Sequence, residues 1–149
     1  MGNQNPNVES QYRTMTILWL ALFNAKLMLL VVLFFAKREI FSFDFAKSPL
    51  GENSAMIIAF AVLGIATFLS SFVLRKKFVS QAISERKASL VQTGLIIACA
   101  LCEATTLLGL VLAFAFNYQF FFLWFALGIL GVILHFPKHD DLIAASCAK

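Results

Sequence analysis

The hydrophobic residues of this chain are gathered into long, nearly uninterrupted blocks, and this feature restricts the possible folds more than any other. At least three blocks hold about 20 residues, enough to cross a hydrocarbon core of about 30 Å as a helix. Hydrophobic residues make up 60% of the 149 and charged residues 13%, against about 45–50% and about 25% in soluble domains. The pattern predicts an integral membrane protein. It excludes a soluble enzyme, a secreted disulfide scaffold and a disordered tail.

The apolar blocks predict an all-α membrane domain, residues 16–136, with four transmembrane helices in up-down-up-down order. A mobile N-terminal tail, 1–15, and a short C-terminal tail, 137–149, flank this domain. Only the short segment 117–119 separates the last two helices, so they are expected to be antiparallel neighbours. Pro137 is expected to end the last helix. The four helices are expected at about residues 16–36, 55–74, 90–116 and 120–136.

The distribution of Lys and Arg predicts how these helices are oriented. Eight basic residues fall on the side that holds both termini and the middle connection, and three fall in the first connection. The excess favours the cytoplasm for both termini of a multi-pass membrane protein. In the middle connection, Phe78, Ala82 and Ile83 at helical spacing predict that helix two or three extends beyond the membrane. The net charge of +4 thus reflects topology, and no nucleic-acid partner is expected.

Lys26 and Glu103 are the charged residues that lie inside the apolar blocks. A charge at the centre of a membrane helix costs about 2.5–3.5 kcal/mol on insertion scales, so both are candidate functional residues. Their depths differ by about 4–5 Å of helical rise, which allows an ion pair between helices one and three. Such a pair would lessen the cost of both charges and join the two helices. Two roles stay open: a pair that only fixes packing, and a carboxylate that exchanges protons.

These two roles make opposite predictions about Glu103. An unpaired carboxyl group in an apolar surrounding would be neutral much of the time and could exchange a proton, whereas one paired with Lys26 would stay charged and exchange poorly. Gln92 and Thr106 lie on the same helical face as Glu103, which makes them candidates to help it bind an ion. The alternative for Thr106 is a hydrogen bond to the backbone of the preceding turn alone.

The segment from Gln92 to Val111 combines three short motifs: Q-T at its start, A-L-C-E-A around Glu103, and G-L-V at its end. In these motifs it resembles the carboxylate helix of the c subunits (proteolipids) of rotary ATP synthases. The basic segment 75–87 is similar to the cytoplasmic loop of that family, and the inferred hairpin orientation agrees. The resemblance implies that Glu103 binds H⁺ or Na⁺, and that the chain is an ion-handling subunit.

The sequence also suits a different class, a non-catalytic accessory subunit of a larger respiratory or photosynthetic membrane complex. Few residues lie outside the apolar blocks, which leaves little room for an independent active site, and no catalytic residue is assigned. The expected partners are membrane lipid and either other transmembrane subunits or further copies of this chain. A homo-oligomeric channel is a third alternative, with only Asn24, Lys26, Gln92 and Glu103 to line its path.

No cofactor or metal motif is evident, although bound lipid or pigment stays open. His135, at the end of the last block, is a weak candidate ligand for a haem or pigment metal, and otherwise an interfacial residue. The aromatic segment 120–125 is either a belt that faces lipid or a partner, or a pigment or quinone pocket. Cys99, Cys102 and Cys147 do not make a disulfide framework and are expected to be reduced.

Overall fold

The computed structural model describes residues 6–41 and 54–147, and every element in these segments is helical. This confirms the all-α class, with no strand in the described part of the chain. Two short 3-10 turns are η1 (Arg38–Phe41) and η2 (Gln119–Phe121), and α5 (His139–Cys147) is a short C-terminal helix. The four main helices are α1 (Pro6–Ala36), α2 (Ser54–Glu85), α3 (Ala88–Phe116) and α4 (Phe122–Leu134).

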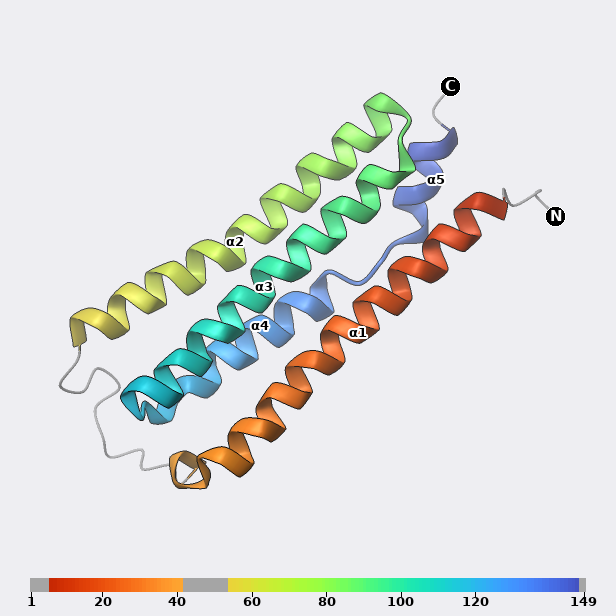
Figure 1. The fold of residues 1–149 in the computed structure, drawn as a ribbon. Helices are drawn as coiled ribbons and strands as arrows, with labels where there is room; N and C mark the ends of the chain where they lie inside the picture. The colour runs from red at the N-terminus through yellow and green to blue at the C-terminus, as the bar shows by residue number, and fades with distance from the viewer. Residues whose placement is uncertain (1–5, 42–53, 148–149) are drawn as a thin grey trace.

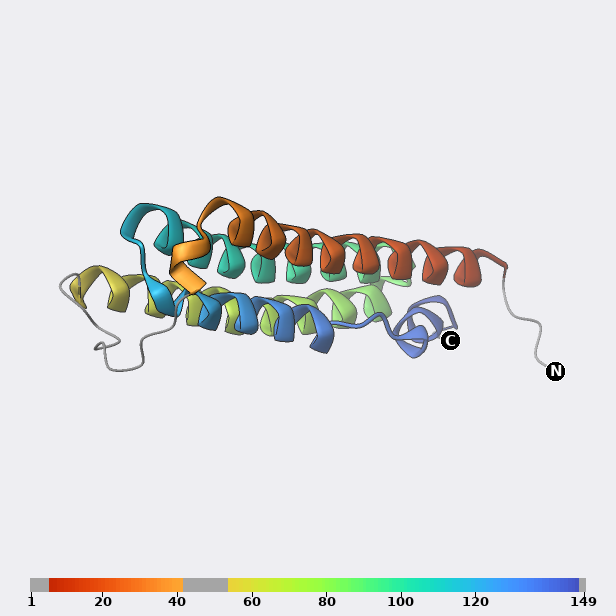
Figure 2. The same cartoon turned by 90° about the horizontal axis from the view of Figure 1, so that it is seen from below.

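The four main helices run side by side in alternating directions (Figure 1). Both ends of the chain and the α2–α3 connection lie at one end of the molecule, and the α3–α4 turn lies at the other. Figure 2 shows two layers, one formed by α1 and α3 and the other by α2, α4 and α5. Helix α3 packs against α1, α2 and α4 and carries many more buried residues than α1 or α2. It is therefore the central helix of the bundle.

Three helices, α1, α2 and α3, are long and apolar enough to cross a membrane. The region predicted as the fourth crossing is different, because α4 ends at Leu134 and a bend of 48° separates it from α5. Pro137 lies in this break and has no backbone N–H to continue a helix. Only as a bent pair do α4 and α5 reach a comparable apolar length. The described helices are compatible with a membrane protein.

The first helix begins much earlier than the sequence predicts. Residues 6–15 are helical, which corrects the expectation of a tail over this stretch, while residues 1–5 lie outside the described segments. Val8 and Met15 belong to one buried cluster with Leu142 and Ala145 of α5. This contact with α5 stabilises the first turns of α1, which are polar in composition. The sequence predicts that helix two or three extends through Phe78, Ala82 and Ile83, and in the structure α2 is the helix that continues, as far as Glu85.

The close approach of α3 and α4 depends on glycine. A Cβ atom at Gly128 would overlap Oγ1 of Thr106 and would lie 2.9 Å from the carbonyl oxygen of Cys102. A Cβ atom at Gly109 would lie 2.7 Å from Cβ of Trp124. Small residues at such contacts let helix backbones approach closely, which is how helices associate where lipid removes the hydrophobic driving force. The backbone of α4 is thereby held against the turn of α3 that carries Glu103.

Candidate functional site

The side chain of Lys26 points from the middle of α1 into the bundle, and none of it is exposed. It shares a face of α1 with the buried residues Met15 and Leu33, which stand at helical spacing from it. Most other residues of α1 are exposed or only partly buried. A lysine therefore occupies one of the few positions at which α1 enters the core.

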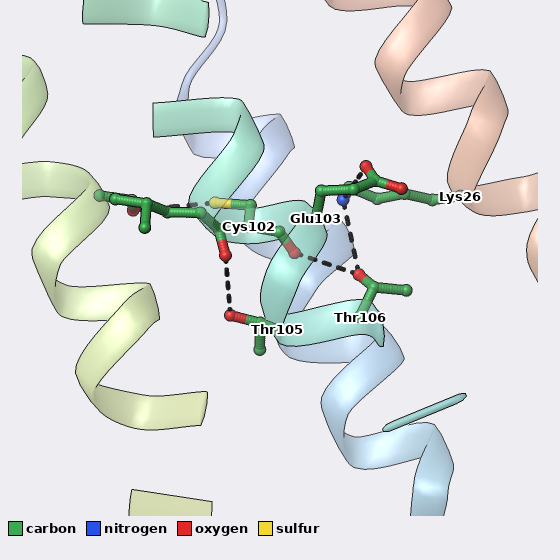
Figure 3. A network of polar contacts seen from close by, with 7 residues as sticks. Lys26, Cys102, Glu103, Thr105 and Thr106 are labelled. Atoms are coloured by element: carbon green, nitrogen blue, oxygen red, sulfur yellow. Dashed lines mark hydrogen bonds and ion pairs between the residues drawn. The ribbon is translucent and has the colours of Figure 1, made fainter. Parts of the chain in front are cut away.

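The Lys26 ammonium meets α3 at Glu103 and Thr106 (Figure 3). Its Nζ atom lies 2.7 Å from Oε2 of Glu103 and 3.5 Å from Oγ1 of Thr106. The Glu103 side chain keeps 23% of its surface exposed, so the carboxylate borders the outside of the bundle whereas the ammonium does not. The ion pair that the sequence allows is present in the structure and joins α1 to α3.

Thr106 bonds the backbone of the preceding turn, as the sequence allows, and it also lies next to Lys26. Its hydroxyl donates to the carbonyl oxygen of Cys102 at 3.2 Å, and its oxygen can then accept from Lys26. The neighbouring Thr105 points away from Lys26, toward α2 (Figure 3). Its Oγ1 lies 2.9 Å from Oγ1 of Thr67. Two adjacent threonines thus serve opposite faces of α3, and only Thr106 contributes to the site.

Gln92 does not join this site. It precedes Glu103 by three turns of α3, about 16 Å along the helix axis, and its side chain makes no hydrogen bond within the described segments. A shared helical face does not bring two residues together when they are separated along the axis. Of the three candidate ion-binding residues, the structure places Glu103 and Thr106 together and leaves Gln92 apart.

A second buried polar network lies between α2 and the end of α4. In the ring of His135, Nε2 lies 2.8 Å from Oγ of Ser71, and Nδ1 lies 3.3 Å from Nη1 of Arg75. Because arginine only donates hydrogen bonds, Nδ1 accepts, and the proton on Nε2 is donated to Ser71. The Ser71 hydroxyl in turn donates to the carbonyl oxygen of Phe68 at 2.6 Å. These bonds favour a neutral imidazole with both nitrogens engaged.

The hydrogen bonds of His135 affect its candidacy as a metal ligand. A metal ligand needs a free ring nitrogen, and the hydrogen bonds of His135 leave none, so they favour a structural role. In the part of the chain that the structure describes, no group of three or more His, Cys, Asp or Glu side chains could hold a metal.

Cys99 and Cys102 are buried and free, as expected. The side chain of Cys147 lies outside the described residues.

The sequence does not predict the network around His135. Ser71 and Arg75 lie on α2, whereas His135 follows α4, far away in the sequence. In the sequence, the basic residue Arg75 is already explained by its role in setting topology. The one signal in the sequence is a histidine two residues before a proline at the end of an apolar block. A further contact that it does not predict joins α1 to α4, where Nε1 of Trp19 donates to the carbonyl oxygen of Val132 at 2.7 Å.

Comparisons of the chain with protein-family models, with curated proteins and with solved structures find no match. Its class therefore rests on the fold and the site. Both describe an all-helical protein with long apolar helices and an ion pair buried between α1 and α3.

Proposed function

We propose that this chain is a non-catalytic subunit of a larger membrane assembly, in which the Lys26–Glu103 pair fixes the position of α1. One observation carries the proposal: a wholly buried ammonium lies 2.7 Å from the Glu103 carboxylate. The ammonium already occupies one oxygen of the carboxylate, so binding of a proton or a sodium ion there would first require the pair to break. Removing one partner of a buried pair leaves an uncompensated charge, so the pair also resists the displacement of α1.

The outer faces of α1 and α2 supply the surface for partners. Large apolar side chains point outward along both helices, among them Met28 and Phe35 on α1 and Val62 and Val73 on α2. Apolar surface of this extent marks contact with lipid or with other proteins. In the proposed arrangement α1, α2, α3 and the bent α4–α5 pair give four crossings, with both termini in the cytoplasm as the basic residues favour.

The second candidate function is an ion-handling subunit of the proteolipid kind. The observation in its favour is the partial exposure of Glu103, which puts the carboxylate at the edge of the bundle, where a partner or an ion could reach it. Ion exchange would require Lys26 to withdraw first, because its ammonium occupies one carboxylate oxygen. The two functions therefore differ in the charge state of Glu103 in the resting protein.

Labelling with a hydrophobic carbodiimide distinguishes these functions, because the reagent attacks protonated carboxyl groups. We expect Glu103 to stay unmodified in the unaltered protein and to react in Lys26→Met, which has lost the counter-ion. Lys37→Met is the matched control. Lys37 donates hydrogen bonds to the carbonyl oxygen of Phe114 and to Oδ1 of Asn117, at the end of α3 and away from Glu103. Glu103 should stay unmodified in that variant. Reaction of Glu103 in the unaltered protein would support ion handling instead.

Native mass spectrometry after gentle extraction tests the assembly itself. We expect the chain to come out with other chains in a fixed ratio, and we expect Glu103→Gln to lower the assembled fraction more than Lys37→Gln does. A homogeneous oligomer of this chain alone would contradict the accessory-subunit proposal. That result, combined with carbodiimide labelling of the unaltered protein, would favour a self-assembled ion-binding ring.

A further inference from the structure

An open hollow of about 280 Å³ lies between α2, the end of α4 and α5. It is separate from the Lys26–Glu103 site and close to the end of the molecule that holds both termini (Figure 1). The hollow brings three basic side chains and a single carboxylate together with apolar walls. Its lining includes Phe72, Arg75, Lys76, Leu134, Lys138 and Asp141.

Arg75 is held in place at the back of this hollow. Its Nη2 atom donates to the carbonyl oxygen of Phe136 at 3.0 Å, its Nη1 atom lies 3.3 Å from Nδ1 of His135, and Oδ2 of Asp141 lies 3.9 Å away. A guanidinium group has five N–H donors, so these contacts leave donors for a ligand. The cation is therefore positioned before any ligand arrives.

Lys76 and Lys138 line the same hollow as Arg75 and are exposed. Within residues 6–41 and 54–147 neither lysine makes an ion pair or a hydrogen bond. Asp141 can balance only one of the three cations around the hollow, so the local charge is positive. Two unpaired ammonium groups beside a fixed guanidinium are a charge arrangement that suits an anion with several oxygens.

Part of the wall of the hollow is apolar. Phe72, Val79 and Leu134 line it, and Leu134 is 52% exposed. Charged and apolar surfaces meet in this way where a transmembrane helix leaves the hydrocarbon layer, which is the depth of lipid headgroups. A ligand with a phosphate group and an acyl chain would satisfy both parts of the wall.

We propose that this hollow binds a phosphate group through Arg75, Lys76 and Lys138, and that an anionic phospholipid or a free phosphate compound supplies it. The apolar wall favours the lipid. This binding is independent of the role proposed for Lys26 and Glu103, so either proposal can fail without the other.

The test is binding of phosphatidylglycerol and phosphatidylcholine to the delipidated full chain, measured by native mass spectrometry. We expect a preference for phosphatidylglycerol. The double variant Lys76→Gln/Lys138→Gln should lower that affinity about tenfold to thirtyfold, since each basic group near the membrane surface contributes about 1 kcal/mol. The control Arg13→Gln/Lys77→Gln removes the same charge from exposed positions outside the hollow, and it should leave the preference unchanged.

Competition with inorganic phosphate identifies the source of the ligand. Displacement of phosphatidylglycerol by inorganic phosphate would show that the phosphate group alone is bound, and resistance to displacement would show that the acyl chain takes part. Equal binding of the two lipids would overturn the proposal, as would equal losses in the two double variants.

Discussion

Helix α3 holds its neighbours by two different means. Toward α4 it packs through glycine, with the backbone of Gly128 against Cys102 and Thr106. Toward α1 it relies on charge, because Lys26 is one of few residues of α1 that are buried. Apolar contacts of α3 with both neighbours are spread over several turns, but the contact with α1 also includes one ion pair, between Lys26 and Glu103. The comparison teaches that a helix with little buried surface can still have a defined position when one polar contact specifies it.

Removing the Glu103 charge should have the largest effect on this arrangement. In Glu103→Gln the ammonium of Lys26 is left wholly buried without a counter-ion, and we expect a loss of about 3–5 kcal/mol in the free energy of unfolding. Equilibrium unfolding in mixed micelles measures it. The double variant Lys26→Met/Glu103→Gln, which removes both charges, should recover most of the loss. A single variant as stable as the unaltered protein would show that α1 does not depend on the pair.

Crowding the other face of α3 should have the next largest effect. In Gly128→Ala the new methyl group overlaps Oγ1 of Thr106 and approaches the Cys102 carbonyl oxygen, so α3 and α4 must separate. We expect a loss of about 1–3 kcal/mol by the same unfolding measurement. Ala126→Val enlarges an exposed position on α4 and is the control. Equal behaviour of the two variants would mean that close approach at Gly128 is not needed.

Trp19→Phe should have a smaller effect, because it removes one hydrogen bond between α1 and α4 and keeps an aromatic ring. The lost bond runs from Nε1 to the carbonyl oxygen of Val132 at 2.7 Å. We expect a loss of about 1 kcal/mol in the free energy of unfolding. The carbonyl oxygen is not left without a partner, because the backbone N–H of His135 also donates to it at 3.1 Å. A loss as large as that of Glu103→Gln would refute the idea that the ion pair dominates the hold on α1.

Lys87→Gln should have the smallest effect. Nζ of Lys87 lies 3.0 Å from Oε2 of Glu85, a distance similar to that in the Lys26–Glu103 pair. Both side chains of the Lys87–Glu85 pair are exposed. Water and salt screen exposed pairs, and side-chain entropy opposes them. We expect no measurable change in the unfolding midpoint, in contrast to the buried pair. A clear loss in Lys87→Gln would show that distance alone, and not burial, decides the strength of these pairs.

The sequence allows the ion pair, because it places two charges at similar depth in apolar blocks, where pairing lowers the cost of both. The separation of Gln92 from Glu103 also follows from the sequence, because the helical rise puts them about 16 Å apart along the axis. The expectation that grouped them considered the helical face alone. The sequence does not predict that residues 6–15 are helical, because their partners Leu142 and Ala145 lie at the other end of the chain. Likewise the bonds between His135, Ser71 and Arg75 depend on the way α2 and α4 meet. Local sequence pattern therefore predicts the helices, whereas the contacts between distant segments of the chain are seen only in the structure.

The shortness of α4 affects the membrane as well as the protein. The turn η2 has 3 residues and α4 has 13, which together give about 25 Å of axis, against a hydrocarbon thickness of about 30 Å. If α4 crosses a bilayer without α5, the lipid beside it would have to thin to match it, at a fraction of a kcal/mol for each Å of mismatch. Such hydrophobic mismatch would direct the protein to thin membranes, and would gather other short-spanning helices on the α4 side.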